Sequence, residues 1–183
     1  MLAANNNRRA KVMKTVRIKV YSFNELSEEA KSKAVSRLDD INVYHDWWVY
    51  SYEDAERIGL KITSFDLDRN RHCKGEFILS ANEVAQNIIN EHGDCNTYKE
   101  AAKFLELWNP VFADYMDESS EKYESSESED KLQELEYDFL ESILDCYAKM
   151  LQDESDYLQS REAIEETILS NDYQFLIDGT MFN

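Results

Sequence analysis

Residues 46–77 read DWWVYSYEDAERIGLKITSFDLDRNRHCKGEF and hold the densest group of structural signals in the chain. A stretch with helical spacing comes first, followed by two apolar runs at residues 60–67 and 75–79. A polar, basic turn at residues 68–74 separates the two runs. This order predicts a helix followed by a β-hairpin with a long polar loop.

The helix in this stretch is predicted to begin at Asp46 and to end at Gly59. Aspartate is a common N-cap residue, and glycine readily adopts the left-handed conformation that closes a helix. Trp47 and Trp48 would then point about 100° apart, so we expect one in the core and the other partly exposed. An exposed aromatic pair could be a secondary contact for a partner, whereas two buried rings would only cover the sheet.

The rest of the chain adds helices and two more candidate strands. Residues 15–21 alternate between apolar and basic side chains, which predicts a half-buried strand, and residues 173–177 resemble a strand that returns to the sheet. A helix from Thr97 should end at Asn109, because Pro110 follows it. Further helical patterns occupy residues 27–38, 80–93, 131–151 and 158–169, and residues 118–130 are either a linker or a solvated helix.

Together these elements predict an α+β fold. An antiparallel sheet of three or four strands would be covered on one face by helices. We expect a disordered leader at residues 1–13, an α+β domain at residues 14–110, and an acidic helical region at residues 111–183 that returns to the sheet. With 1 proline and 4 glycines, the composition favours long helices.

Charge is the strongest functional feature of the sequence. The net charge is −18, which excludes a nonspecific phosphate-binding surface for the chain as a whole and favours a basic protein partner. Residues 111–172 carry 20 acidic and 4 basic side chains, a net of −16. Carboxylates spaced along rigid helices can imitate a nucleic-acid backbone, and the apolar side of the same helices could bind a partner helix or form a homodimer. The alternative is an acidic face that only keeps the protein soluble.

The predicted contact residues are therefore carboxylates that follow Pro110. They are Asp114, Asp117, Glu118, Glu121, Glu124, Glu127, Glu129, Asp130, Glu134, Asp138 and Glu141. Trp47, Trp48, Arg69 and Arg71 are candidates for a secondary contact.

A metal-dependent hydrolase centred on Asp66, Asp68 and His72 is a further hypothesis, since carboxylates and imidazole bind metals. Arg69 and Arg71 lie among these residues and would repel a cation, so we expect no metal. A pair of Cys73 or Cys95 with His92 could supply a nucleophile and a base. The chain has no GxSxG, HExxH or phosphate-binding glycine loop, and we expect neither enzymatic activity nor a cofactor.

Three widely spaced cysteines without a CxxC pair indicate a reducing, cytoplasmic setting. The first residues lack the apolar core of a secretory signal, and no apolar run approaches the length that spans a bilayer. The sequence therefore predicts neither a membrane contact nor direct binding of nucleic acid.

The segments YSFNELSEEAKSKAV (residues 21–35) and DWWVYSYEDAERIGLKITSFDLDRNRHCKGEF carry a family resemblance. They resemble a group of uncharacterised proteins from phages and mobile elements of bacteria, some of which bear an automatic label as antitoxins of toxin–antitoxin systems. The likeness covers residues 16–78 and implies a mobile-element origin, but it brings no catalytic residues.

These observations lead to one main functional prediction. The protein is expected to be a non-enzymatic, phage-encoded inhibitor whose acidic helices block a basic nucleic-acid-binding surface of a host enzyme or defence complex. The alternative is an antitoxin-like protein that neutralises a toxin through the apolar side of the same helices.

Overall fold

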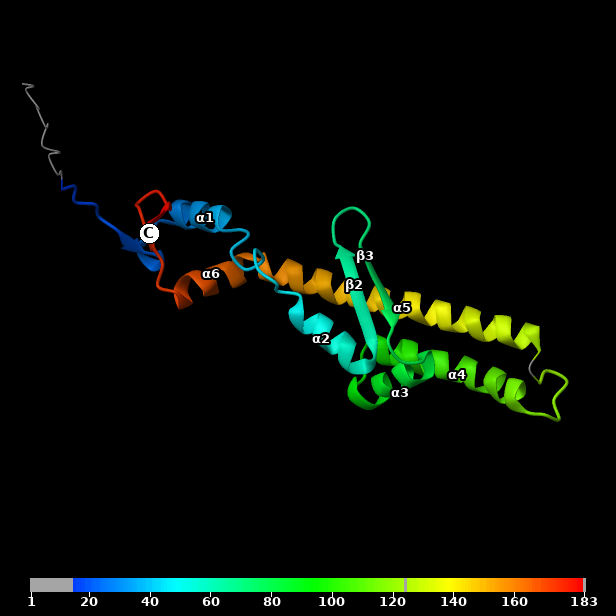
Figure 1. The fold of residues 1–183 in the computed structure, drawn as a ribbon. Helices are drawn as coiled ribbons and strands as arrows, with labels where there is room; N and C mark the ends of the chain where they lie inside the picture. Colours follow the sequence, from blue (N-terminus) through cyan, green and yellow to red (C-terminus); the bar gives the residue numbers. More distant parts are fainter. Residues whose placement is uncertain (1–14, 124, 183) are drawn as a thin grey trace, which may run out of the picture. The chain divides into compact units, whose positions relative to one another are not determined.

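A computed structural model describes residues 15–123 and 125–182, so the leader predicted at residues 1–13 lies outside the described residues. The fold is α+β, as predicted (Figure 1). In chain order the elements are β1 (Tyr21–Ser22), a 3-10 turn (Phe23–Glu25), α1 (Glu28–Arg37), α2 (Val49–Ile58), β2 (Leu60–Asp66), β3 (His72–Phe77), α3 (Ala81–Glu91), α4 (Asn96–Met116), α5 (Ser126–Leu158), α6 (Arg161–Ser170), β4 (Gln174–Phe175) and β5 (Met181–Phe182).

The chain forms two compact units: residues 39–164, and the two chain ends, described at residues 15–38 and 165–182. The domain boundary expected at Pro110 falls inside the larger unit, because α4 continues through this proline to Met116. The predicted helix end at Asn109 is therefore wrong. Proline removes one backbone donor, and the ring stack of Trp108 on Phe112, with centroids 4.3 Å apart, spans the affected turn.

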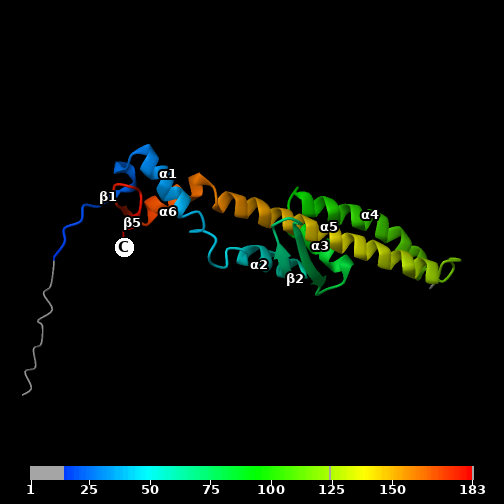
Figure 2. The ribbon, with the colours of Figure 1, turned by 90° about the horizontal axis from the view of Figure 1, so that it is seen from above.

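The larger unit is built on the antiparallel helices α4 and α5, which lie side by side (Figure 2). The hairpin β2–β3 packs on α5, and α3 packs on α4. A continuous series of aromatic contacts crosses these layers. Phe139 of α5 lies between Phe77 of β3 and Phe104 of α4, at centroid distances of 5.7 Å and 4.4 Å, and Trp108 continues the series along α4. Aromatic contacts thus join the sheet to both long helices.

The stretch at residues 46–77 forms the predicted helix and hairpin, with one correction. Gly59 has φ of 93° and closes α2, as expected. The helix begins at Val49 and not at Asp46, so both tryptophans precede it. Their indoles pack edge-on against Phe65 of β2, with centroids 5.8 Å and 5.6 Å away. This packing holds Trp47 and Trp48 in the turn that leads into α2.

The single sheet predicted from the sequence is wrong, because the strands form two separate sheets. One contains β2 and β3, and the other has the order β1-β4-β5. The strand expected at residues 15–21 is reduced to Tyr21–Ser22. Val16 and Ile18 are 75% and 55% exposed, so the apolar side of this segment does not pack on an apolar layer.

The long acidic helix begins earlier than residue 131. Ser125 caps α5 by accepting a hydrogen bond from the Ser128 amide at 3.2 Å, so residues 126–130 are helical. Residues 117–123 form turns, with Ser119 bonded to Asp117. The segment at residues 118–130 is therefore part loop and part helix in its described portion.

The smaller unit holds the chain ends together through β1, β4 and β5. Phe23 packs against the buried Phe175, with ring centroids 5.9 Å apart. Gly179 has φ of 82°, and a Cβ there would collide with the carbonyl oxygen of Ala30. A glycine is thus required at this turn both for its backbone conformation and for its close approach to α1.

Candidate functional site

Six carboxylates form a line along the solvent side of α5, here called the acidic stripe. All six side chains are exposed, and they recur every three or four residues over about five helical turns, with a spacing of about 5.4 Å. Duplex DNA carries one charge per about 3.4 Å of each strand, so the charge density of the stripe is of the same order. The stripe consists of Glu127, Asp130, Glu134, Asp138, Glu141 and Asp145.

The acidic stripe is only partly neutralised by the protein itself. Glu134 pairs with Lys131 at 2.7 Å, and Asp145 pairs with Arg71 of the β2–β3 turn at 3.4 Å. The other four members have no ion pair within the described part of the chain. Exposed pairs of this kind are weak, so most of the charge remains available to a partner.

Five of the predicted contact residues belong to the acidic stripe, and the other six lie elsewhere. Glu129 points away from the stripe because it lies two residues beyond Glu127, about 200° around the helix. Asp117 hydrogen-bonds the hydroxyl and amide of Ser119, which lowers the pKa of its carboxyl. Its role is to shape the turn that follows α4.

The remaining predicted residues lie at the turn between α4 and α5. Asp114 pairs with Lys122 at 3.6 Å across this turn, and Glu118 and Glu121 are exposed within it. Glu124 lies outside the described residues. Asp145 was not predicted, although its position 18 residues after Glu127 continues the helical period.

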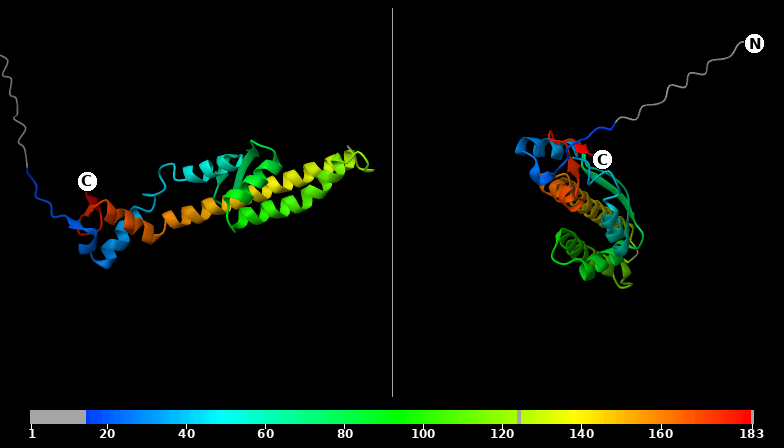
Figure 3. Two further views of the ribbon diagram at one scale, coloured as in Figure 1. Left: turned by 90° about the horizontal axis from the view of Figure 1, so that it is seen from below. Right: turned by 90° about the vertical axis from the view of Figure 1, so that its left-hand side faces the viewer.

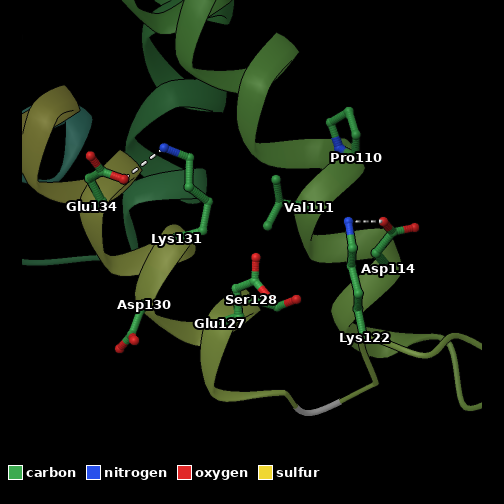
Figure 4. Close-up of a pocket in the computed structure, with 9 residues that line it drawn as sticks. All are labelled: Pro110, Val111, Asp114, Lys122, Glu127, Ser128, Asp130, Lys131 and Glu134. Atoms are coloured by element: carbon green, nitrogen blue, oxygen red, sulfur yellow. Dashed lines mark hydrogen bonds and ion pairs between the residues drawn. The ribbon is translucent and has the colours of Figure 1, made fainter.

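A groove of about 590 Å³ lies between the ends of α4 and α5 (Figure 4). Val111 lies at its centre, and the buried Ser128 also lines it. The pairs Lys122–Asp114 and Lys131–Glu134 flank Val111 on opposite sides in Figure 4. Sequence reasoning missed this groove, because it depends on which residues of two antiparallel helices lie opposite one another.

A buried polar network connects α5 with α2 and the start of α4. The Tyr147 hydroxyl donates to Asp54 at 2.8 Å, and His92 Nε2 lies 3.5 Å from the same carboxylate. Burial, reinforced by the Asp54 charge, raises the pKa of Tyr147. The Thr97 hydroxyl lies 2.8 Å from His92 Nδ1 and 3.0 Å from the sulfur of Cys95.

This network separates the predicted nucleophile from its base. Thr97 stands between Cys95 and His92 and is itself buried. Cys73 is buried in β3, where burial raises its thiol pKa to about 11. We therefore assign the network to the stability of the scaffold.

Asp66 and His72 lie opposite each other across β2 and β3, and Asp68 lies in the turn between them. Asp66 accepts a hydrogen bond from the Asp68 amide at 2.9 Å, and His72 Nδ1 lies 2.8 Å from the Asn70 carbonyl. Within residues 15–123 and 125–182, no group of three or more His, Cys, Asp or Glu side chains could hold a metal ion. Arg69 is exposed at the same turn.

Comparison of the chain with protein-family models, curated proteins and solved structures finds no match. Among the described helices, none combines the length and the apolar character needed to cross a bilayer.

Proposed function

We propose that the protein is a non-enzymatic inhibitor, encoded by a phage or mobile element, that acts in the bacterial cytoplasm. Its acidic stripe imitates a nucleic-acid backbone and occupies the basic nucleic-acid-binding surface of a host enzyme or defence complex. The observation that carries the proposal is the regular, exposed spacing of the stripe carboxylates along one rigid helix.

Rigidity supports this proposal, because a partner does not have to order the stripe on binding. The inner side of α5 is anchored by Phe139, Ile143 and Tyr147, which are all buried.

The charge of α5 supports the proposal as well. Within α5 there are 11 acidic and 2 basic residues, so a basic surface would be attracted from a distance and the attraction would weaken with salt.

Affinity capture from a bacterial lysate tests the proposal with three forms of the protein. The wild type should retain a basic, nucleic-acid-binding protein at low salt and release it when duplex DNA or high salt is added. Glu134→Lys/Asp138→Lys/Glu141→Lys should abolish capture. The matched control Glu53→Lys/Glu56→Lys/Glu91→Lys changes the net charge equally at exposed positions outside the stripe and should retain the partner. Capture that survives both high salt and reversal of the stripe contradicts nucleic-acid mimicry.

An antitoxin-like role is the second candidate, and it is favoured by the apolar side chains exposed on α4. Leu107 is 49% exposed and Val111 is half-buried in the groove. A toxin bound mainly through these side chains would remain bound at high salt, because apolar contacts are not screened. The salt dependence of capture therefore separates the two candidates.

A further inference from the structure

Two hollows are lined on α4 by residues three or four apart, from Lys103 and Leu107 to Val111 and Asp114, so they lie on one face of the α4–α5 pair and follow one another along it. The larger is the groove around Val111, and the smaller, of about 70 Å³, contains Leu107, Leu135 and Asp138. On α5 the lining runs from Glu127 to Ser142, which is about 22 Å at 1.5 Å per residue. This length matches about four turns of an α-helix.

The floor of this groove contains apolar side chains. Phe104 and Phe139 are buried beneath it, while Leu107 of the smaller hollow remains 49% exposed. Among the described residues of the larger unit, no third helix or strand covers the far end of the helix pair, where α4 and α5 extend beyond the hairpin and α3 (Figure 3). The exposed apolar floor is a surface on which another helix can pack.

The rims of the groove are acidic. Six carboxylates and three lysines line the two hollows or their edges. The lysines pair with Glu100, Asp114 and Glu134, at 3.8, 3.6 and 2.7 Å. The other three carboxylates have no ion pair within residues 15–123 and 125–182, and they are Glu127, Asp130 and Asp138. The rims therefore attract a cationic occupant.

We infer that this groove binds one basic, amphipathic α-helix of the partner protein, which completes a three-helix bundle with α4 and α5. The inference rests on the proposed function, since it specifies the partner element that meets the acidic stripe. Apolar side chains of that helix, spaced by three or four residues, pack on Leu107 and Val111. Its lysines and arginines lie beside Glu127 and Asp138 on the α5 rim.

Other occupants fit this groove less well. The backbone groups of α4 and α5 are already bonded within each helix, so an extended peptide would find no backbone partners there, whereas a helix satisfies its own. A second copy of the same helix pair would bring acidic rims against acidic rims, because α5 has 11 acidic residues against 2 basic ones. Charge complementarity thus selects a basic helix.

A fluorescently labelled model peptide tests the inference directly. The probe is an amphipathic helix of about 14 residues with leucine on one face and lysine on the other, used at low concentration in an anisotropy titration against the full chain. One control peptide has glutamate in place of lysine, and a second has the Leu/Lys composition in an order without an apolar face. We expect saturable binding of the amphipathic basic peptide only.

Two pairs of variants locate the binding. Leu107→Ser should weaken the basic peptide about fivefold or more, because a half-exposed leucine loses its partner surface. Met116→Ser, at an exposed position on the opposite side of α4, should leave affinity unchanged. Asp138→Asn should weaken binding, whereas Glu129→Gln should not. Circular dichroism melting of all four variants checks that the fold is retained.

The outcomes distinguish this inference from the proposed function. If the scrambled basic peptide binds as tightly as the amphipathic one and both depend on the stripe carboxylates, the groove inference is wrong and charge-driven mimicry stands. Equal binding after Leu107→Ser also overturns the groove inference. If no basic peptide binds at low salt, both proposals fail.

Discussion

The two halves of the α4–α5 helix pair have the same helical geometry but different surroundings. In the proximal half, residues 96–105 and 139–151, apolar side chains are buried by α3 and the hairpin. In the distal half, residues 106–116 and 126–138, Leu107, Phe112 and Met116 of α4 and Tyr137 of α5 remain exposed. Folding thus uses most of the apolar surface of the proximal half, whereas the distal half retains apolar surface that folding does not use, and the acidic stripe runs along both halves of α5.

The largest effect is expected from the proximal aromatic core. Phe139→Ala should lower the free energy of unfolding by about 3–5 kcal/mol, because it empties the space between Phe77 and Phe104. Tyr137→Ala, only two residues away and 63% exposed, should change it by less than about 0.5 kcal/mol. Urea denaturation measures both values, and similar losses would contradict the division into two halves.

A gain in stability is expected in the distal half from Pro110→Ala. Proline in a helix interior costs about 3 kcal/mol relative to alanine, and the helix continues to Met116. We expect thermal melting to show stabilisation of about 1–3 kcal/mol. No gain would mean that α4 ends before the proline, as the sequence pattern suggests.

The polar network of the proximal half should contribute about 2 kcal/mol through the hydrogen bond from Tyr147 to Asp54. Tyr147→Phe removes this bond and should lower stability at neutral pH. Because burial raises the pKa of Tyr147 above its unfolded value near 10, the stabilisation is complete below about pH 10 and is lost as pH rises further. The free energies of unfolding of wild type and variant, measured by urea denaturation, should therefore differ at neutral pH and converge at alkaline pH. A difference that stays constant with pH would contradict the assignment.

The smallest effect on stability is expected from the acidic stripe. Asp138→Asn/Glu141→Gln should change the free energy of unfolding by no more than about 0.5 kcal/mol, and reduced repulsion favours a slight gain. The same change should reduce the salt dependence of partner binding. A large loss of stability would instead assign these carboxylates to the fold, as for the buried aromatic core.

Local features of the fold were predictable from the sequence. Gly59 closes α2, and Ser80 with Glu83 forms a capping box at the start of α3, because these effects depend on residues within one turn. The apolar spacing after residue 131 likewise identified α5. Five of the carboxylates proposed as partner contacts recur along this helix and lie on its exposed side, where the acidic stripe is.

Features that depend on distant parts of the chain were not predictable. The alternation at residues 15–21 resembles a strand, but pairing with β4 reaches only Tyr21 and Ser22. The groove at Val111 requires knowledge of which α5 residues face it, and the continuation of α4 past Pro110 depends on tertiary packing. Trp47 and Trp48 pack on Phe65 of the hairpin, which supports the alternative in which these rings cover the sheet.

The central claim is that the acidic stripe competes with nucleic acid for one surface of the partner. The most direct test is an anisotropy titration in which the captured partner, bound to labelled DNA or RNA, is challenged with the wild type, the stripe variant Glu134→Lys/Asp138→Lys/Glu141→Lys or the control variant Glu53→Lys/Glu56→Lys/Glu91→Lys. We predict that the wild type and the control displace the nucleic acid competitively, and that the stripe variant does not. A stable ternary complex, or equal displacement by all three forms, would contradict the claim.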